Sequence, residues 1–140
     1  MAVIFETAPL AETCEVCGSE MQCSVTEAVV NIGPRWDMEC GCSSCGNNWH
    51  TGGFGTSPGF VRKAIIAQNG LTKLKLAESG GNNAAVAKVL RDTLSLPLSE
   101  IATAVRKIRT DGYEGSLVEV HSLAIALEKA GVGFVIDRSE

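Results

Sequence analysis

The cysteine residues constrain what this chain can fold into more than any other feature, because all six lie within a 32-residue stretch of the 140-residue sequence. Four of them belong to two copies of one element, CxxCG, at residues 14–18 and 42–46. In such a knuckle the two intervening residues let both sulfurs reach one ion, and the glycine permits a tight turn. Two knuckles supply the four thiolates that close a tetrahedral zinc shell. The sequence therefore predicts a zinc ion held by Cys14, Cys17, Cys42 and Cys45.

The segment between the knuckles is typical of a β-hairpin. Ser24–Ile32 is rich in Val and Thr, Gly33 and Pro34 indicate a turn, and Arg35–Glu39 follows as the second strand. A β-hairpin with two CxxC knuckles is a zinc ribbon, which we expect over residues 1–51. A shell closed by four thiolates has no open position for water, so we expect the zinc to stabilise a small core and not to catalyse a reaction.

Three residues near the knuckles leave alternatives open. Cys40 lies two residues before Cys42, so it could replace a ligand or approach Cys23 across the hairpin. Alternatively, Cys23 and Cys40 are small apolar core residues. His50 could be a ligand in a site with three cysteines. An enzyme would need one of these residues to be reactive, and no Ser-His-Asp set, HExxH motif or pair of carboxylates stands out, so we expect a protein without enzymatic activity.

The charge distribution argues against DNA binding by the first half of the chain. Residues 1–58 contain one basic residue, Arg35, and seven acidic ones, whereas residues 59–140 contain eleven basic and nine acidic residues. Phosphate contacts need Lys and Arg, and four thiolates around a zinc ion would add further negative charge. Nucleic-acid or ribosomal-RNA binding through Arg106, Lys107 and Arg109 of the second half is an alternative, although cations at the end of a helix also complement its dipole.

The second half is expected to form an α/β domain after a Gly-rich linker at residues 52–58. Ser57 and Pro58 indicate the N-cap and first residue of a helix over Phe60–Gln68. Alternating Leu and Lys then predict a strand at residues 71–76, and Gly80–Asn83 interrupts the chain before the next helix. The domain boundaries predicted in this way are 1–51, 52–58 and 59–140.

Helical periodicity indicates three more helices, and two further segments are expected to be extended. The expected elements are helices over 84–94 and 98–108, an extended piece over Ser116–Val118, a helix containing His121 and ended by Gly131, and a strand over 132–136. The inner face of the helix over 98–108 is predicted to include Leu98. This order calls for a small α/β sandwich of three antiparallel strands with helices on one face, so the fold class is α+β.

Three stretches of this half occur in the order AVAKVLR (85–91), LPLSEIA (96–102) and LEKAGV (127–132). Together they resemble the C-terminal domain of the bacterial ribosomal stalk protein, in which VIKxVR, GLGLKEAK and LExAGA follow one another. An adaptor of the Clp protease shares that fold. The resemblance covers about residues 71–137. The chain departs from the family pattern at Asn83, Ser95, Pro97, Ser99 and Ala102, so most of the basic, glycine-lined surface of the family is absent.

The resemblance implies a protein that binds other proteins through its paired helices, such as translation factors or a protease chaperone. It places the contact near the turn between the two helices. Leu94 faces the core by periodicity, so Leu96 is the candidate for an exposed apolar contact, and Lys88 and Arg91 could supply charge at its rim. The alternative is that Leu96 seals the junction between the helices. We therefore expect a non-enzymatic adaptor or inhibitor in a bacterium, linked to translation or the ribosome, with an immunity protein that neutralises a toxin as an alternative.

The N-terminal residues MAVIFETAPLAE contain no basic region ahead of a long apolar stretch, and no apolar run approaches the length of a membrane span. A cytoplasmic location is expected.

Overall fold

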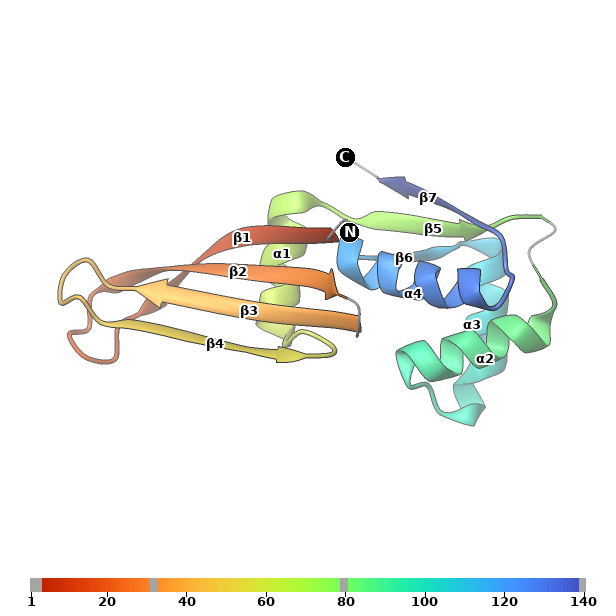
Figure 1. Cartoon of the computed structure of the whole chain (residues 1–140), viewed down its shortest axis with the longest axis horizontal. Coiled ribbons are helices and arrows are strands. Elements are labelled where there is room, and N and C mark those ends of the chain that lie inside the picture. The colour runs from red at the N-terminus through yellow and green to blue at the C-terminus, as the bar shows by residue number, and fades with distance from the viewer. Residues whose placement is uncertain (1–3, 31–32, 79–80, 139–140) are drawn as a thin grey trace. The chain divides into compact units, whose positions relative to one another are not determined.

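The computed structural model describes residues 4–30, 33–78 and 81–138. These residues form seven strands and four helices (Figure 1), and the chain divides into two compact units, residues 1–70 and 71–140. Each unit has its own cluster of buried apolar residues. The protein is thus of mixed α/β class. No helix in the described ranges has the length and apolar character that a membrane span requires.

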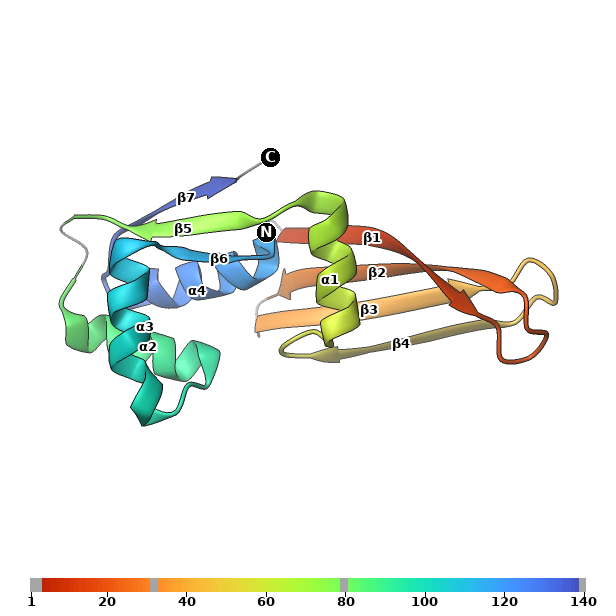
Figure 2. The same ribbon diagram turned by 180° about the vertical axis from the view of Figure 1, so that it is seen from behind.

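Unit 1 is built on an antiparallel sheet in which the described strands pair in sequence order, β1-β2-β3-β4. The strands are β1 (Ile4–Thr13), β2 (Glu20–Val30), β3 (Gly33–Gly41) and β4 (Asn48–Phe54). One helix, α1 (Gly59–Asn69), crosses a face of this sheet and packs against β1 and β2 (Figures 1 and 2). The predicted hairpin thus corresponds to β2 and β3, but Gly33 and Pro34 begin β3, and Ile32 lies outside the described residues.

The covered face of the sheet follows the period of two that a half-buried strand requires. Along β2, Met21, Cys23 and Val25 are buried, whereas the residues between them are exposed. Val61 and Ile65, one turn apart on α1, are fully buried in the same cluster. The helix therefore closes the core of this unit.

The domain boundary differs from the one expected from composition. Residues 48–54 form β4, α1 belongs to unit 1, and the division follows Gly70. Two of the glycines that suggested a linker, Gly52 and Gly53, serve close packing instead, because a Cβ atom on Gly52 would lie 2.6 Å from the backbone oxygen of Trp36. A Cβ atom on Gly53 would lie 3.2 Å from Nε1 of the Trp36 side chain. The two glycines thus leave room on β4 for the backbone and the side chain of Trp36.

Ser57 was expected to cap α1, but its hydroxyl has another partner. The N-cap position is Pro58, without a side-chain cap, and Ser57 Oγ donates a hydrogen bond to Oε2 of Glu27 at 2.7 Å. Glu27 is buried in the sheet, where a carboxylate without a hydrogen bond is costly. The segment before α1 is thereby tied to β2.

Unit 2 contains an antiparallel sheet whose described strands have the order β6-β5-β7. These are β5 (Thr72–Leu76), β6 (Tyr113–Gly115) and β7 (Phe134–Arg138). The helices α2 (Asn83–Leu94), α3 (Leu98–Thr110) and α4 (Leu117–Lys129) lie on one face of this sheet (Figure 1). The predicted arrangement of three antiparallel strands with helices on one face is present.

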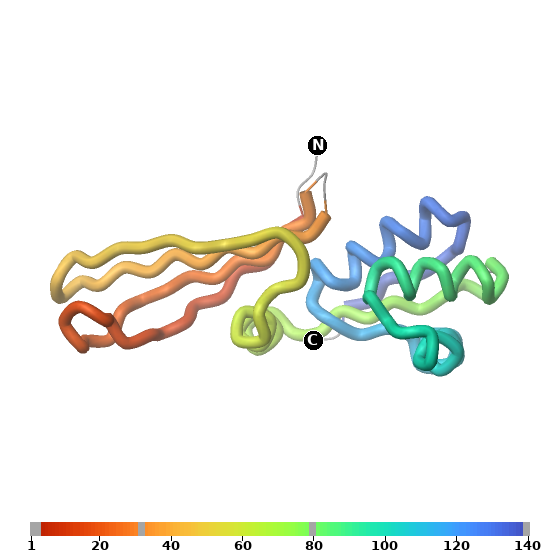
Figure 3. Tube along the Cα trace, turned by 90° about the horizontal axis from the view of Figure 1, so that it is seen from below, coloured from red at the N-terminus to blue at the C-terminus, as the bar shows by residue number. Residues whose placement is uncertain are grey.

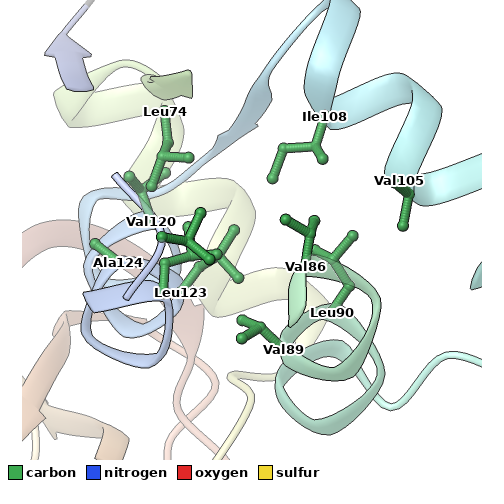
Figure 4. Packing of buried hydrophobic residues seen from close by; sticks show 11 residues of the cluster. Leu74, Val86, Val89, Leu90, Val105, Ile108, Val120, Leu123 and Ala124 are labelled. Carbon is green, nitrogen blue, oxygen red and sulfur yellow. The ribbon is translucent and has the colours of Figure 1, made fainter. Parts of the chain in front are cut away.

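Apolar side chains from the three helices and β5 turn toward one another in the core of unit 2 (Figure 4). They include Leu74, Val86, Leu90 and Leu123, each almost completely buried. The start of α2 is set by a side-chain cap, because the Asn82 side chain accepts a hydrogen bond from the amide of Ala85 at 2.8 Å. Gly80, which the sequence also placed in this break, lies outside the described residues.

Two details of unit 2 correct the sequence prediction. Ser116 does not begin an extended piece over 116–118; it is the N-cap of α4 and forms a capping box with Glu119. The short strand of this region is β6, which ends at Gly115. Leu98, expected on the inner face of α3, is 81% exposed. It is the first residue of the helix, where the chain has not yet turned toward the core.

We expect Ile65→Ala to destabilise unit 1 by about 2 to 5 kcal/mol, because the substitution leaves a cavity between α1 and the sheet. Hydrogen exchange of the full-length protein should show faster exchange in β1 and β2 and unchanged exchange in α2 and α4. Leu123→Ala is the matched control and should produce the opposite pattern. Loss of protection in unit 2 after Ile65→Ala would place α1 in the second domain after all.

Candidate metal centre

The first knuckle is the loop between β1 and β2, and its backbone is held by two hydrogen bonds. The amide of Cys14 donates to the carbonyl of Ser19 at 2.8 Å, and the amide of Gly18 donates to the carbonyl of Cys14 at 2.9 Å. Gly18 has φ of 76°, in the left-handed region that favours glycine. This turn brings Cys14 and Cys17 to the same side of the loop.

The second knuckle, between β3 and β4, repeats this geometry. The amide of Cys42 donates to the carbonyl of Asn47 at 2.9 Å, the amide of Gly46 donates to the carbonyl of Cys42 at 2.8 Å, and Gly46 has φ of 80°. One loop connects β1 to β2 and the other connects β3 to β4. Because these strands are adjacent and antiparallel, both loops lie together at one end of the sheet (Figure 3). The tertiary fold thus joins two sites that are 25 positions apart between Cys17 and Cys42.

The predicted ligands Cys14, Cys17, Cys42 and Cys45 form one cluster in which all sulfur atoms lie within 4.8 Å of one another. The Sγ atoms of Cys14 and Cys45 are 3.7 Å apart, and those of Cys17 and Cys42 are 3.6 Å apart. A tetrahedral site with metal–sulfur bonds of ~2.3 Å has sulfur–sulfur edges of ~3.8 Å. The sulfurs therefore fit a tetrahedral metal ion.

The cluster is half enclosed. Cys14 and Cys42 are 1% and 3% exposed, whereas Cys17 and Cys45 face solvent. The side-chain amide of Asn47 lies 3.8 Å from Cys14 Sγ and donates to it. Such outer contacts orient a ligand and stabilise its negative charge.

The sulfurs do not share negative charge equally. The backbone amide of Cys17 lowers the pKa of the Cys14 thiol to about 6, and the Ser19 side chain lowers the pKa of Cys17. At Cys45 the backbone amide of Asn47 favours the thiolate, but desolvation and the neighbouring thiols outweigh it and raise the pKa to about 12. Mutual repulsion keeps closely spaced thiols from ionising together, and a bound cation relieves that repulsion.

The other two cysteines are not part of this ligand set. Cys23 and Cys40 form a disulfide with a Cα–Cα distance of 4.1 Å, and they are partners in the β2–β3 register. They are 6% and 5% exposed, in the same buried cluster as Cys14 and Cys42. Of the alternatives that the sequence left open, the structure contains the one in which Cys40 approaches Cys23 across the hairpin.

His50 is also outside the metal cluster. It lies on β4 opposite Glu39, and its Nε2 atom is 3.3 Å from Oδ1 of Asp37. The same oxygen accepts a hydrogen bond from Arg35 at 3.0 Å. A site of three cysteines and His50 does not form.

The residues predicted to contact a partner lie in unit 2, and they differ in exposure. Lys88 and Arg91 are exposed on α2, and Nε of Arg91 lies 3.3 Å from Oδ1 of Asp92. Leu96 is half-buried and packs against the core. Leu98 is the exposed apolar residue of this turn, and the sequence analysis missed it because Leu98 also fits the apolar periodicity of α3.

No protein-family model, no curated protein and no solved structure matches this chain.

We expect Cys42→Ser to weaken metal binding by more than about tenfold, because even the loss of an outer contact costs that much in such sites. The measurement is cobalt titration, in which tetrahedral thiolate coordination produces sulfur-to-metal and d–d absorption bands. Ser44→Ala in the same knuckle is the control and should leave the bands unchanged. An unaltered spectrum for Cys42→Ser would remove this residue from the ligand set.

Proposed function

We propose that this protein is a non-enzymatic protein-binding module whose first unit is stabilised by zinc in a zinc-ribbon site. The observation that supports the metal is the cluster of cysteine sulfurs at tetrahedral spacing. Thiolates are soft ligands that suit zinc and disfavour magnesium or calcium. Four of them fill the coordination shell, so a substrate or water finds no open position, which favours a structural role.

The knuckles themselves give a reason for a structural metal. Their loops bury little apolar surface, and Val16 in the first loop is 70% exposed. A loop of this kind lacks a core of its own, so the free energy of metal binding becomes free energy of folding. Zinc would stabilise the end of the sheet that lies beyond the apolar core around Val25 and Ile65.

We place protein binding on unit 2, at the turn between α2 and α3. Leu98 supplies an exposed apolar contact, and Lys88 and Arg91 lie exposed on the preceding helix. The resemblance to the ribosomal stalk domain motivates this surface and a bacterial, cytoplasmic adaptor or inhibitor connected with translation.

Nucleic-acid or ribosome binding through the basic end of α3 is less favoured, because Arg109 has a structural task. Its Nε atom donates to Oδ1 of Asn83 at 2.8 Å, and its Nη2 atom donates to the carbonyl of Gly81 at 2.9 Å. These bonds tie the end of α3 to the start of α2. A toxin as the partner would make the protein an immunity protein acting through the same surface.

Purified protein should contain about one zinc ion per chain, measured by elemental analysis. Removal of zinc with a chelator should accelerate amide exchange in residues 14–18 and 42–46 while α2, α3 and α4 stay protected, because the metal lies in unit 1. Zinc added back should restore protection, whereas magnesium should not. Iron in place of zinc, or no bound metal, would contradict the proposal.

Once a partner has been isolated with the full-length protein as bait, Leu98→Ser should weaken its binding at least about tenfold, as expected for a central apolar contact. The melting temperature should not change, because Leu98 is exposed. Leu96→Ala is the contrasting variant and should lower the melting temperature. Full binding by Leu98→Ser and Lys88→Glu would move the interface elsewhere. A steep loss of affinity with salt would favour a nucleic-acid partner instead.

A further inference from the structure

The disulfide occupies the row of the sheet next to the metal centre. Across the covered face, the register aligns Leu10 of β1, Cys23 of β2, Cys40 of β3 and Trp49 of β4. Cys40 is two residues from the ligand Cys42, on the same face of the chain. The covalent bond thus joins the two strands that carry the knuckles, close to where both leave the sheet.

This position shortens the connection between the knuckles. Cys17 and Cys42 are 25 positions apart, and the disulfide bypasses the 17 positions between Cys23 and Cys40, which leaves about 8. When the metal-free hairpin opens, the segment between the knuckles becomes a flexible loop whose closure entropy grows as three halves of the logarithm of its length, so this shortening favours the meeting of the knuckles by about fivefold. The disulfide therefore preorganises the metal-free ligand set.

The disulfide also controls how many thiols surround the metal. Cys14, Cys23, Cys40 and Cys42 all belong to one buried cluster. While Cys23 and Cys40 are joined, neither sulfur is available as a thiolate ligand. Reduction would place two more thiols beside the four ligands, where they compete for the ion.

We propose that Cys23–Cys40 is a redox switch of the metal centre, in which the oxidised form binds zinc more tightly than the reduced form. The inference rests on the proposed zinc site. In the switching step a thiolate of a dithiol reductant attacks one sulfur of the pair, the Cys23–Cys40 bond breaks, and a mixed disulfide forms. The second thiol of the reductant then displaces the remaining cysteine, so that the reductant becomes a disulfide and both cysteines take up a proton. An oxidised thiol compound of the same class reverses the exchange.

Trp49 provides a reporter for the state of the switch. It lies directly opposite Cys40 in the β3–β4 register and is 40% exposed. A disulfide beside an indole quenches its fluorescence by accepting an electron from the excited ring, so reduction should increase the emission. Trp36 lies elsewhere on β3, and Trp49→Phe should abolish most of the increase.

The test compares zinc affinity in defined redox states of the full-length protein. Zinc is titrated in competition with a chromophoric chelator, using oxidised protein, protein reduced with a phosphine, and the Cys23→Ser/Cys40→Ser double variant. A phosphine is used because dithiols themselves bind zinc. The mass of the intact chain confirms the state of the pair, and alkylation of zinc-loaded protein counts the free thiols.

Reduction should weaken zinc binding about fivefold, and the double variant should bind with a similarly reduced affinity. Phosphine should have no further effect on the double variant, and Ser24→Ala, on the opposite face of β2, should bind like the native protein. If the double variant does not fold, the comparison of oxidised and reduced native protein decides.

Equal zinc affinity of the oxidised and reduced forms would overturn the switch, and so would a disulfide that resists reduction in the folded protein. Absence of zinc binding in every state is a different outcome, since it would remove the proposed metal function itself.

Discussion

The antiparallel pairing of β2 with β3 is the constraint on which the rest of unit 1 depends. Its register places Cys23 opposite Cys40 and Val25 opposite Met38. It also brings the start of β2 and the end of β3, which adjoin the two knuckles, to the same end of the sheet. A slip of one residue would turn every side chain of a strand to the other face. The disulfide, the covered core and the meeting of Cys14 and Cys17 with Cys42 and Cys45 would then be lost together.

The two ends of this sheet differ in the side chains that the fold brings together. Near α1, apolar packing of Val61 and Ile65 and the hydrogen bond from Ser57 to Glu27 close the core. At the knuckles little apolar surface is buried, and the structure instead places four sulfurs at metal-binding distance. Unit 2 has an apolar core of its own, so the candidate metal site and the proposed protein contact belong to separate units.

Much of the candidate metal site could be predicted because it depends on local spacing. Two residues between cysteines and a following glycine define a knuckle whatever surrounds it, and both knuckles have the expected turns at Gly18 and Gly46. The helices of unit 2 were also recognisable from the recurrence of apolar residues every three to four positions. In contrast, β1 carries Pro9 within its span and β4 contains two adjacent glycines, so their local composition argued against strands.

The sequence by itself determined which four cysteines form the candidate metal site, the order of most elements and the two-part organisation of the chain, because these follow from short-range periodicity and spacing. Only the tertiary structure decided that Cys23 and Cys40 are joined, that α1 belongs to the first unit, and that Leu98 is exposed whereas Leu96 packs against the core. The physical reason is that these properties depend on contacts between residues far apart in the chain. Strand register and the close approach of Trp36 to Gly53 exist only once the sheet has formed, and no local pattern records them.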